Sequence, residues 1–284
     1  MSLGRQGASL TSSLPGVTDQ SREAAGRDEE AGLRWEIAAA VATITLDRPA
    51  ALNAQTPRTW SALRRIGRSL PDDVRVVVVR GEGRAFSAGM DRRMFTPEGV
   101  PGTRSAAALA RLPGDEADAL MSRYQEAFGW LRRDDLVTVA AVQGHAIGAG
   151  FQLALACDFR VLADDAQLCM AETTLGLVPD LGGTKPLVTL VGPSRALEIC
   201  LTGRRIGAAE ALRIGLATLV VAPGELEGAV EDLVAAVLAP PQGAVTETKA
   251  LLAAAAARSQ AEQEAAERAA QLRRLRELTG AREA

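Results

Sequence analysis

Two short and almost wholly apolar segments constrain the fold of this 284-residue chain more than any other feature. They are VRVVVVRG at residues 74–81 and LVTVAAV at residues 136–142. A β-strand that is apolar at nearly every position has no face for solvent, so it is covered on both sides, as in parallel sheets. Residues 41–47, VATITLD, alternate like a further strand. Together the segments predict an α/β fold in which helices cover a parallel sheet.

The segment TPRTWSALRRIGRSL at residues 56–70 predicts a helix. Thr56 is suited to cap its N-terminus, and Pro57 is suited to the first helical position. Four arginines, Arg58, Arg64, Arg65 and Arg68, give this helix a basic face. Because the whole chain carries a formal net charge of −3, we interpret that face as a solvated surface rather than a nucleic-acid site.

Composition divides the chain into three parts. Residues 1–32 are polar and read as a mostly disordered leader, and residues 33–223 hold the patterned core. Residues 224–284 are rich in Ala, Glu, Arg and Leu and predict a helical region whose apolar side packs on the core or on another subunit. Within the core, residues 92–117 contain several prolines and glycines and predict a functional or mobile loop.

Composition also excludes several classes of function. Aromatic residues make up only 3% of the chain, and its balance is acidic, which argues against nucleic-acid partners. No apolar stretch approaches the roughly 18 residues of a membrane helix. One histidine and three cysteines without paired spacing predict no metal site and reduced thiols, as in a cytoplasmic protein.

Two turns of small residues follow apolar strands, AFSAGMD at residues 85–91 and GHAIGAGF at residues 144–151. Each turn can open a helix, where backbone N–H groups have no helical partner. Two such groups that converge on one point would form an oxyanion hole. From the spacing alone, however, glycines that merely permit tight turns are the simpler interpretation.

Five segments in order resemble the signatures of the crotonase, or enoyl-CoA hydratase/isomerase, superfamily. They are DRPAALNA (47–54), AFSAGMD (85–91), AVQGHAIGAGFQLALACDFRV (141–161), AETTLGLVPDLGGTKPLVTLVG (171–192) and ALEICLTGRRIGAAEALRIGLATLVV (196–221). The resemblance covers the chain from about residue 33 onward. It implies a ClpP-like spiral of β-β-α repeats and a C-terminal helical region that builds homotrimers, often paired into hexamers.

The resemblance also implies where an acyl-CoA thioester binds. The oxyanion hole would be formed by the backbone N–H groups of Met90 and Ala149. The CoA contacts would come from Ala50, Ala51, Leu52, Ala88, Met90, Asp91, Arg92, Arg93 and Ala149. Relatives often carry Lys or Arg at the positions of Ala50 and Ala51, so the cation that meets the CoA phosphates stays open, with Arg93 as one candidate. No separate cofactor is implied, because coenzyme A arrives as part of the substrate.

Gln152 departs from the hydratase pattern. Hydratases of the superfamily hold water between two glutamates that are twenty positions apart, which match Gln152 and Glu172 here. A glutamine can orient water but cannot take its proton, because its amide is not basic. The resemblance therefore favours a Δ3,Δ2-enoyl-CoA isomerase, in which the single base Glu172 moves a proton from C2 to C4.

Three alternatives stay open. Dienoyl-CoA isomerases carry a second acid at the position of Asp180, but that aspartate can equally form an Asx-turn, and those enzymes have an aspartate where Gln152 stands. An atypical hydratase would use Glu172 with water held by Gln152. A non-catalytic CoA-thioester binder is the third, although it would not need Glu172. A dehalogenase is disfavoured, because its partner histidine and tryptophan match Gln125 and Glu172.

Overall fold

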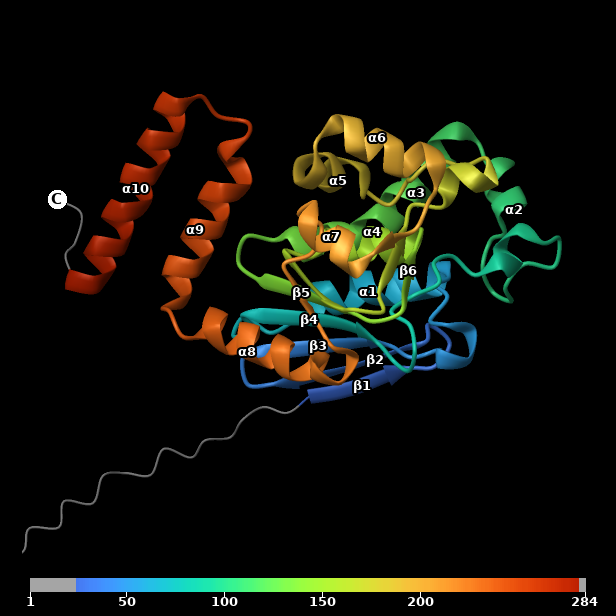
Figure 1. The fold of residues 1–284 in the computed structure, drawn as a ribbon, viewed down its shortest axis with the longest axis horizontal. Helices are drawn as coiled ribbons and strands as arrows, with labels where there is room; N and C mark the ends of the chain where they lie inside the picture. The colour runs from blue at the N-terminus through green and yellow to red at the C-terminus, as the bar shows by residue number, and fades with distance from the viewer. Residues whose placement is uncertain (1–23, 281–284) are drawn as a thin grey trace, which may run out of the picture.

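A computed structural model describes residues 24–280 of the chain, which form an α/β structure (Figure 1). Within these residues, one sheet has seven strands in the order β1-β2-β3-β4-β5-β7-β10, and a second has three in the order β6-β8-β9. The strands are β1 (Ala24–Asp28), β2 (Leu33–Ala38), β3 (Val41–Leu46), β4 (Val76–Gly81), β5 (Val137–Val142), β6 (His145–Ile147), β7 (Phe159–Ala163), β8 (Gln167–Cys169), β9 (Ile206–Gly207) and β10 (Leu219–Val221).

The helices account for most of the remaining described residues. The α-helices are α1 (Pro57–Ser69), α2 (Ala106–Ala110), α3 (Gly114–Gly129), α4 (Ala149–Ala156), α5 (Thr184–Val191), α6 (Pro193–Thr202), α7 (Ala208–Arg213), α8 (Leu226–Leu238), α9 (Gln242–Ala255) and α10 (Gln260–Thr279). Short 3₁₀ helices are η1 (Pro49–Ala51), η2 (Arg92–Phe95), η3 (Trp130–Arg132), η4 (Glu172–Leu175) and η5 (Pro223–Glu225).

The two apolar segments form the centre of the large sheet, as predicted. Strands β3, β4, β5, β7 and β10 run parallel, and β1 and β2 join antiparallel at one edge. Val77 and Val79 of β4 belong to the core shared with α1, α3 and α4, whereas Val76 and Val78 pack with Val230 of α8. Because each strand is buried on both faces, its sequence needs no polar alternation.

Helix α1 begins as its sequence predicts. The Thr56 hydroxyl accepts from the Thr59 N–H, the Thr59 hydroxyl accepts from the Thr56 N–H, and Pro57 is the first helical residue. These reciprocal bonds satisfy donors that a helix N-terminus leaves unpaired. The positive charge of the basic face is compensated by nearby acids of β1, of the turn after β1 and of α3. The ion pairs are Arg65 with Asp28, Arg58 with Glu30, and Arg64 and Arg68 with Glu126.

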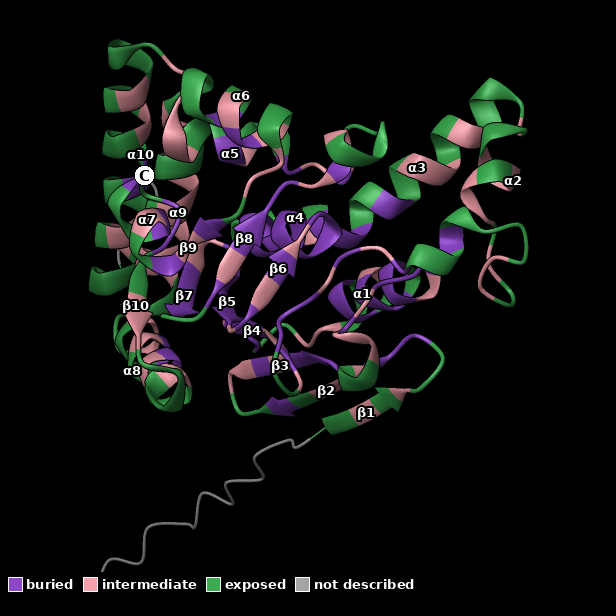
Figure 2. Cartoon of the chain, turned by 45° about the vertical axis from the view of Figure 1, so that its right-hand side comes forward, coloured by how far each residue is buried: buried purple, intermediate pink, exposed green. Residues whose placement is uncertain are grey.

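The small sheet and its helices form a second layer. Helix α4 follows β6 after Gly148 and is buried along its whole length, as Figure 2 shows. Helices α5 and α6 lie beyond α4, on the side away from the large sheet (Figure 1). This arrangement places the N-terminus of α4 between the large sheet and the segment that follows β8.

The chain ends in three helices, as the composition of residues 224–284 predicts. Helix α8 covers the outer face of β4, β5 and β7, while α9 and α10 form a hairpin that stands beside the body (Figure 1). Lys249 of α9 fastens this hairpin, because its ammonium donates to the Leu136 carbonyl at 2.6 Å and to the Asp158 carboxylate at 2.7 Å. Leu252, Leu272 and Leu278 of the hairpin are at least half exposed.

Two expectations about irregular segments are corrected. Residues 24–32, assigned to a disordered leader, instead form strand β1 and a turn, and Gly26 of β1 lies against the Trp35 ring of β2. Residues 1–23 of that leader lie outside the described residues. The segment 92–117, expected as a loop, contains η2, α2 and the start of α3, and Ser105 caps α2 by accepting from the Ala108 N–H.

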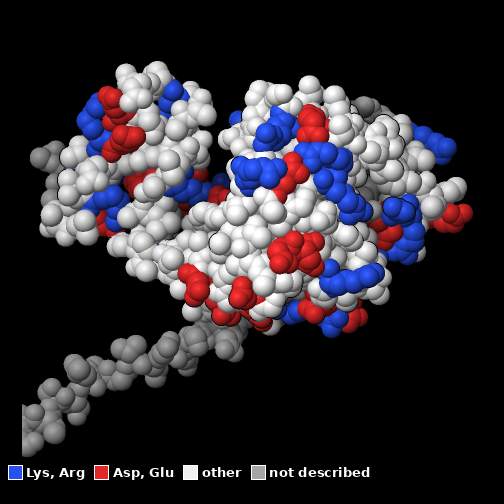
Figure 3. Space-filling view, viewed as in Figure 1, with Lys and Arg blue, Asp and Glu red and all other residues white. Residues whose placement is uncertain are grey.

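Charged side chains of both signs are mixed on the surface, as a formal net charge of only −3 leads one to expect (Figure 3). On the face in Figure 3, basic and acidic side chains lie next to one another. Across residues 24–280, no helix combines the length and the apolar character that a membrane crossing requires.

Candidate active site

The two turns of small residues lie side by side and are joined through their backbones. The Ser87 N–H donates to the His145 carbonyl at 2.7 Å, and the Ile147 N–H donates to the Ser87 carbonyl at 3.0 Å. Gly89 makes the closest approach, with a φ of +88°. A Cβ atom there would stand 2.5 Å from the Ile147 carbonyl oxygen and 3.5 Å from the Ala149 nitrogen. Only glycine lets the turns meet in this way.

At this contact each turn offers an unpaired donor. The neighbouring N–H groups are used, since Asp91 donates to the Gln55 carbonyl and Gly148 donates to the Cys169 carbonyl. The N–H groups of Met90 and Ala149, by contrast, have no acceptor among residues 24–280. The sequence predicts an oxyanion hole at these two residues, and the structure places both donors at the junction of the turns. A carbonyl oxygen that gains negative charge would satisfy both.

Gln152 is wholly buried in α4, and its amide is used at both ends. Its oxygen accepts from the N–H groups of Leu181, at 2.9 Å, and Gly183, at 3.2 Å. Its nitrogen donates to Glu172 Oε1 at 2.7 Å. The amide oxygen is therefore already engaged by the backbone, and the amide nitrogen can only donate.

Glu172 begins η4, directly after β8, and its side chain points toward α4. It is 9% exposed. Oε1 takes the hydrogen bond from Gln152, while Oε2 is buried and has no partner among the described residues. Burial raises the pKa of Glu172, and the nearby charge of Asp180 raises it further. A buried carboxyl with one unsatisfied oxygen and a raised pKa is suited to accept and return a proton.

Asp180 lies close enough to Glu172 for its charge to act on that carboxyl. Burial raises the pKa of Asp180 as well. Within the described part of the chain, its carboxylate does not bond to the Gly182 N–H, so the Asx-turn considered for this residue is not formed. The structure thus joins Gln152 and Glu172 by a buried hydrogen bond, and the partly exposed Asp180 acts on Glu172 through its charge.

The predicted CoA contacts come from three segments that meet at the first turn. The Ala88 N–H donates to the Leu52 carbonyl at 2.8 Å, which joins η1 to the turn. Asp91 is bound by Arg93 and also by Arg48, at 2.8 and 2.9 Å, and these bonds hold the pKa of Asp91 well below its ordinary value. Arg92 is exposed and has no acid partner in residues 24–280, so it is a freer cation than Arg93 for a phosphate.

Two residues with a structural part in this site were missed from the sequence, Arg48 and Arg132, and Gln125 was noted only as the match to the dehalogenase histidine. Arg48 follows Asp47 in a matched segment, which could have singled it out. Gln125 and Arg132 donate to the backbone carbonyls of Asp180 and Gly182, a kind of contact that leaves no sequence pattern.

The single histidine and the buried Cys157 form no hydrogen bond with Gln152 or Glu172 in the described residues. His145 lies in β6 beside Arg205, with 3.3 Å between His145 Nδ1 and the guanidinium. Burial raises the pKa of Cys157 to about 12, which leaves its thiol neutral. In the described residues, no group of His, Cys, Asp and Glu side chains is arranged to hold a metal ion.

Comparisons with known proteins point to one kind of enzyme. Residues 36–278 match the family model described as enoyl-CoA hydratase/isomerase. A probable enoyl-CoA hydratase of Mycobacterium tuberculosis is 34% identical over 188 residues, which are 66% of this chain and 67% of that protein. A carnitinyl-CoA dehydratase of Escherichia coli is 39% identical over 187 residues, 64% of this chain and 65% of that protein.

A solved structure is still more similar. The putative enoyl-CoA hydratase from Thermobifida fusca, in complex with acetoacetyl-CoA, is 53% identical and superimposes with a TM-score of 0.85. The match covers 88% of this chain and 96% of that one. The same bacterial protein has also been solved with CoA.

Proposed function

Because the chain belongs to the enoyl-CoA hydratase/isomerase family, we propose that it moves a double bond in an acyl-CoA thioester, with Glu172 as the proton shuttle. The family and its crotonase fold agree with the sequence resemblance. The proposed reaction within the family depends on one observation: the amide of Gln152 stands where a second carboxylate would be needed to activate water.

The substrate carbonyl would bind at the junction of the two turns. Its oxygen would accept from the N–H groups of Met90 and Ala149, and coenzyme A would lie along the segments of Leu52 and Ala88–Arg93. Two fixed donors favour an enolate over the neutral thioester, because the negative charge develops at the oxygen that they contact. The similar Thermobifida structures with CoA and acetoacetyl-CoA support this class of ligand.

Glu172 would then act through Oε2. Its other oxygen is held by Gln152, so Oε2 is the oxygen left to meet the substrate. In a 3-enoyl-CoA, Oε2 takes a proton from C2, the electrons pass into a dienolate, and the carboxyl returns the proton at C4. The raised pKa of Glu172 makes this exchange easier, because a base works best when its pKa approaches the operating pH.

Addition or removal of water, the reactions in the names of the two relatives, is less well supported by this site. It requires a group that removes a proton from water while another delivers one to carbon. Gln152 cannot take a proton, and its oxygen is occupied by two backbone N–H groups. A second candidate is a dienoyl-CoA isomerisation, in which Asp180 delivers the proton that Glu172 does not; the proximity of these two acids favours it.

The test compares a 3-enoyl-CoA with a 2-enoyl-CoA as substrates. Isomerisation of the first creates the absorbance of a conjugated thioester, whereas hydration of the second removes it. We expect the first reaction to dominate. Glu172→Gln should lower its kcat by about 10²- to 10⁴-fold, the usual contribution of a general base, while thioester affinity is retained. In the unchanged protein, kcat/KM should fall on the acid side as Glu172 becomes protonated, at a pH above the ordinary glutamate range.

Asp180→Asn separates the two isomerase mechanisms. A loss as large as that of Glu172→Gln would assign a proton step to Asp180, and a small loss would leave Glu172 as the single base. Full activity of Glu172→Gln would refute both mechanisms. Faster hydration than isomerisation by the unchanged protein would replace the proposed reaction with that of a hydratase.

A further inference from the structure

The segment Asp180–Gly183 is held by side chains from three other elements. Gln125 of α3 donates to the Asp180 carbonyl at 2.8 Å, and Arg132 at the end of η3 donates to the Gly182 carbonyl at 2.9 Å. Between these contacts, Gln152 of α4 accepts from the N–H groups of Leu181 and Gly183. Each of the four residues therefore has one backbone group fixed from outside the segment.

Apart from these bonds, the segment is anchored by the side chain of Leu181, which is buried in the hydrophobic core. It precedes α5, pairs with no strand, and contains two adjacent glycines, of which Gly182 has a φ of +81°. It also carries a carboxylate that is only partly exposed, and burial of a charged group is unfavourable. Loss of the bonds from Gln125 and Arg132 would free the carbonyls of Asp180 and Gly182 on either side of this anchor.

We propose that Gln125 and Arg132 are positioning residues, which hold Asp180 beside Glu172 by fixing the backbone of residues 180–183. The proposal rests on the proposed function, because the distance between the two acids matters only if Glu172 transfers a proton. Gln125 and Arg132 touch neither the reacting carboxyl nor the two unpaired N–H groups, so they act through the backbone of the segment that carries Asp180.

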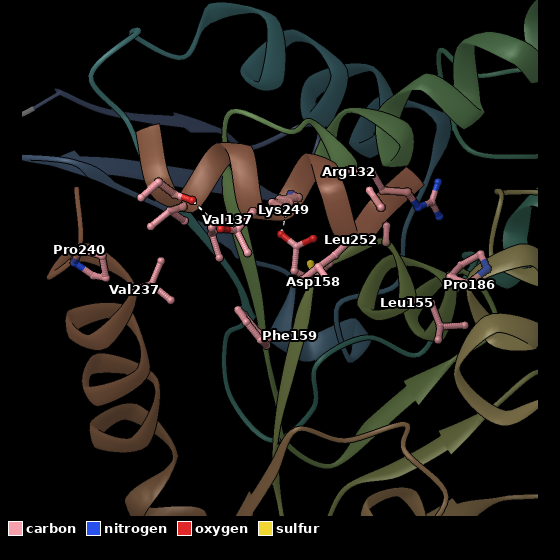
Figure 4. A pocket seen from close by; sticks show the side chains of 16 residues that line it. Arg132, Val137, Leu155, Asp158, Phe159, Pro186, Val237, Pro240, Lys249 and Leu252 are labelled. Carbon is pink, nitrogen blue, oxygen red and sulfur yellow. Dashed lines mark hydrogen bonds and ion pairs between the residues drawn. The ribbon is translucent and has the colours of Figure 1, made fainter. Parts of the chain in front are cut away.

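Arg132 bonds to the backbone of this segment and not to a carboxylate. Figure 4 shows its guanidinium pointing away from the Lys249–Asp158 pair and toward Pro186 of α5. Asp158 already has Lys249 as its counterion, and the bond from Arg132 goes to a carbonyl. Burial lowers the pKa of Arg132, but a guanidinium remains charged in any working range, so its donation to Gly182 does not vary with pH.

The pH dependence of the reaction reports the position of Asp180. The ionisable groups whose charges act with Glu172 are Asp180, Cys169 of β8 and Cys200 of α6. Burial raises the pKa of both thiols, so they stay neutral where Glu172 titrates. A retreat of Asp180 would remove the like charge and let the pKa of Glu172 fall.

The experiment measures kcat, KM and the acid limb of kcat/KM on a 3-enoyl-CoA for Gln125→Ala and Arg132→Ala. In each variant we expect kcat to fall by no more than it does in Asp180→Asn, with little change in KM, because these changes act on the position of Asp180. The acid limb should move to lower pH, in the same direction as in Asp180→Asn. Arg132→Lys keeps one donor and should restore part of kcat. Arg123→Ala, an exposed change on the same helix as Gln125, is the control and should leave all three values unchanged.

A double variant distinguishes positioning from a general loss of structure. When Asp180→Asn is already present, Arg132→Ala should shift the acid limb no further. An additional shift, or an unaltered acid limb in both single variants, would overturn the proposal. If Arg132→Ala does not fold, the exposed Gln125→Ala carries the same test. Failure of the proposed function is seen separately, as retained activity in Glu172→Gln.

Discussion

The wholly buried amide of Gln152 bonds to hydrogen-bond donors through its oxygen and to a hydrogen-bond acceptor through its nitrogen. Its oxygen accepts from two backbone N–H groups, while its nitrogen donates to Glu172. A glutamate at this position could keep the first contacts, but it would face Oε1 of Glu172 with an oxygen of its own. Two carboxylates at hydrogen-bond distance must share a proton, which raises the pKa of the pair.

Gln152→Glu should therefore change the reaction as well as its pH dependence. The variant carries the pair of acids that can hold and activate water, so we expect measurable hydration of a 2-enoyl-CoA, seen as loss of the conjugated absorbance. The acid limb of isomerisation should move to higher pH, because the added carboxylate raises the pKa of Glu172. Gln152→Ala is the control, since it removes the amide without adding an acid. Equal hydration by both variants would contradict this account.

Single residues of the site differ in how far their positions can be predicted from the sequence. The resemblance identifies Gln152, Glu172 and the two oxyanion donors, because these lie in contiguous motifs. It does not reveal the contacts of Gln125 and Arg132, whose partners are main-chain carbonyls 55 and 50 positions away. A contact to a carbonyl requires no particular partner residue, so nothing in the partner's sequence marks it.

At the scale of secondary-structure elements, the sequence predicts best those strands and helices whose own residues carry a burial pattern or a cap. Strands β4 and β5 are apolar on both faces, and α1 has a specific cap, so each carries its own local signal. Strand β1, with the sequence AAGRD, has no such signal and exists because β2 offers it an edge. Helix α2 was missed for a similar reason: its flanking prolines and glycines conceal five helical residues.

The junction of the two turns yields a prediction at this scale. Gly89→Ala would place a Cβ 2.5 Å from the Ile147 carbonyl at a φ of +88°, which forces the turns apart. Since this misaligns the donors, kcat should fall about 10²- to 10³-fold, the usual cost of one lost oxyanion donor. Gly215→Ala is a matched control, because its φ is +82° and its nearest neighbour would be 3.4 Å away. A similar loss in the control would attribute the effect to backbone strain alone.

At the scale of the whole molecule, the hairpin of α9 and α10 is the part least explained by a single subunit. Figure 2 shows it mostly exposed, and it carries the half-exposed leucines Leu252, Leu272 and Leu278. Exposed apolar side chains gathered on one element usually mark a protein interface. Together with the family resemblance, this supports a homotrimer or a hexamer of two trimers.

Light scattering tests the assembly directly. The subunit mass is 29.7 kDa, so we expect three or six times that value at micromolar concentration. Paired changes of Leu272 and Leu278 to Glu should lower the measured mass, whereas changes of the exposed Glu264 and Glu267 to Gln on the same helix should not. A mass of one subunit for the unchanged protein would refute the predicted assembly.

The backbone bonds between Ser87, His145 and Ile147 have a consequence for how this site tolerates mutation. Both proposed oxyanion donors belong to the main chain, so an exchange of the Met90 side chain leaves its N–H in place. The neighbouring residues therefore determine whether the two N–H groups converge. The most important of them is Gly89, where any side chain would clash with the Ile147 carbonyl. In a scan of single substitutions, we expect most replacements of Met90 to retain activity and most replacements of Gly89 to lose it.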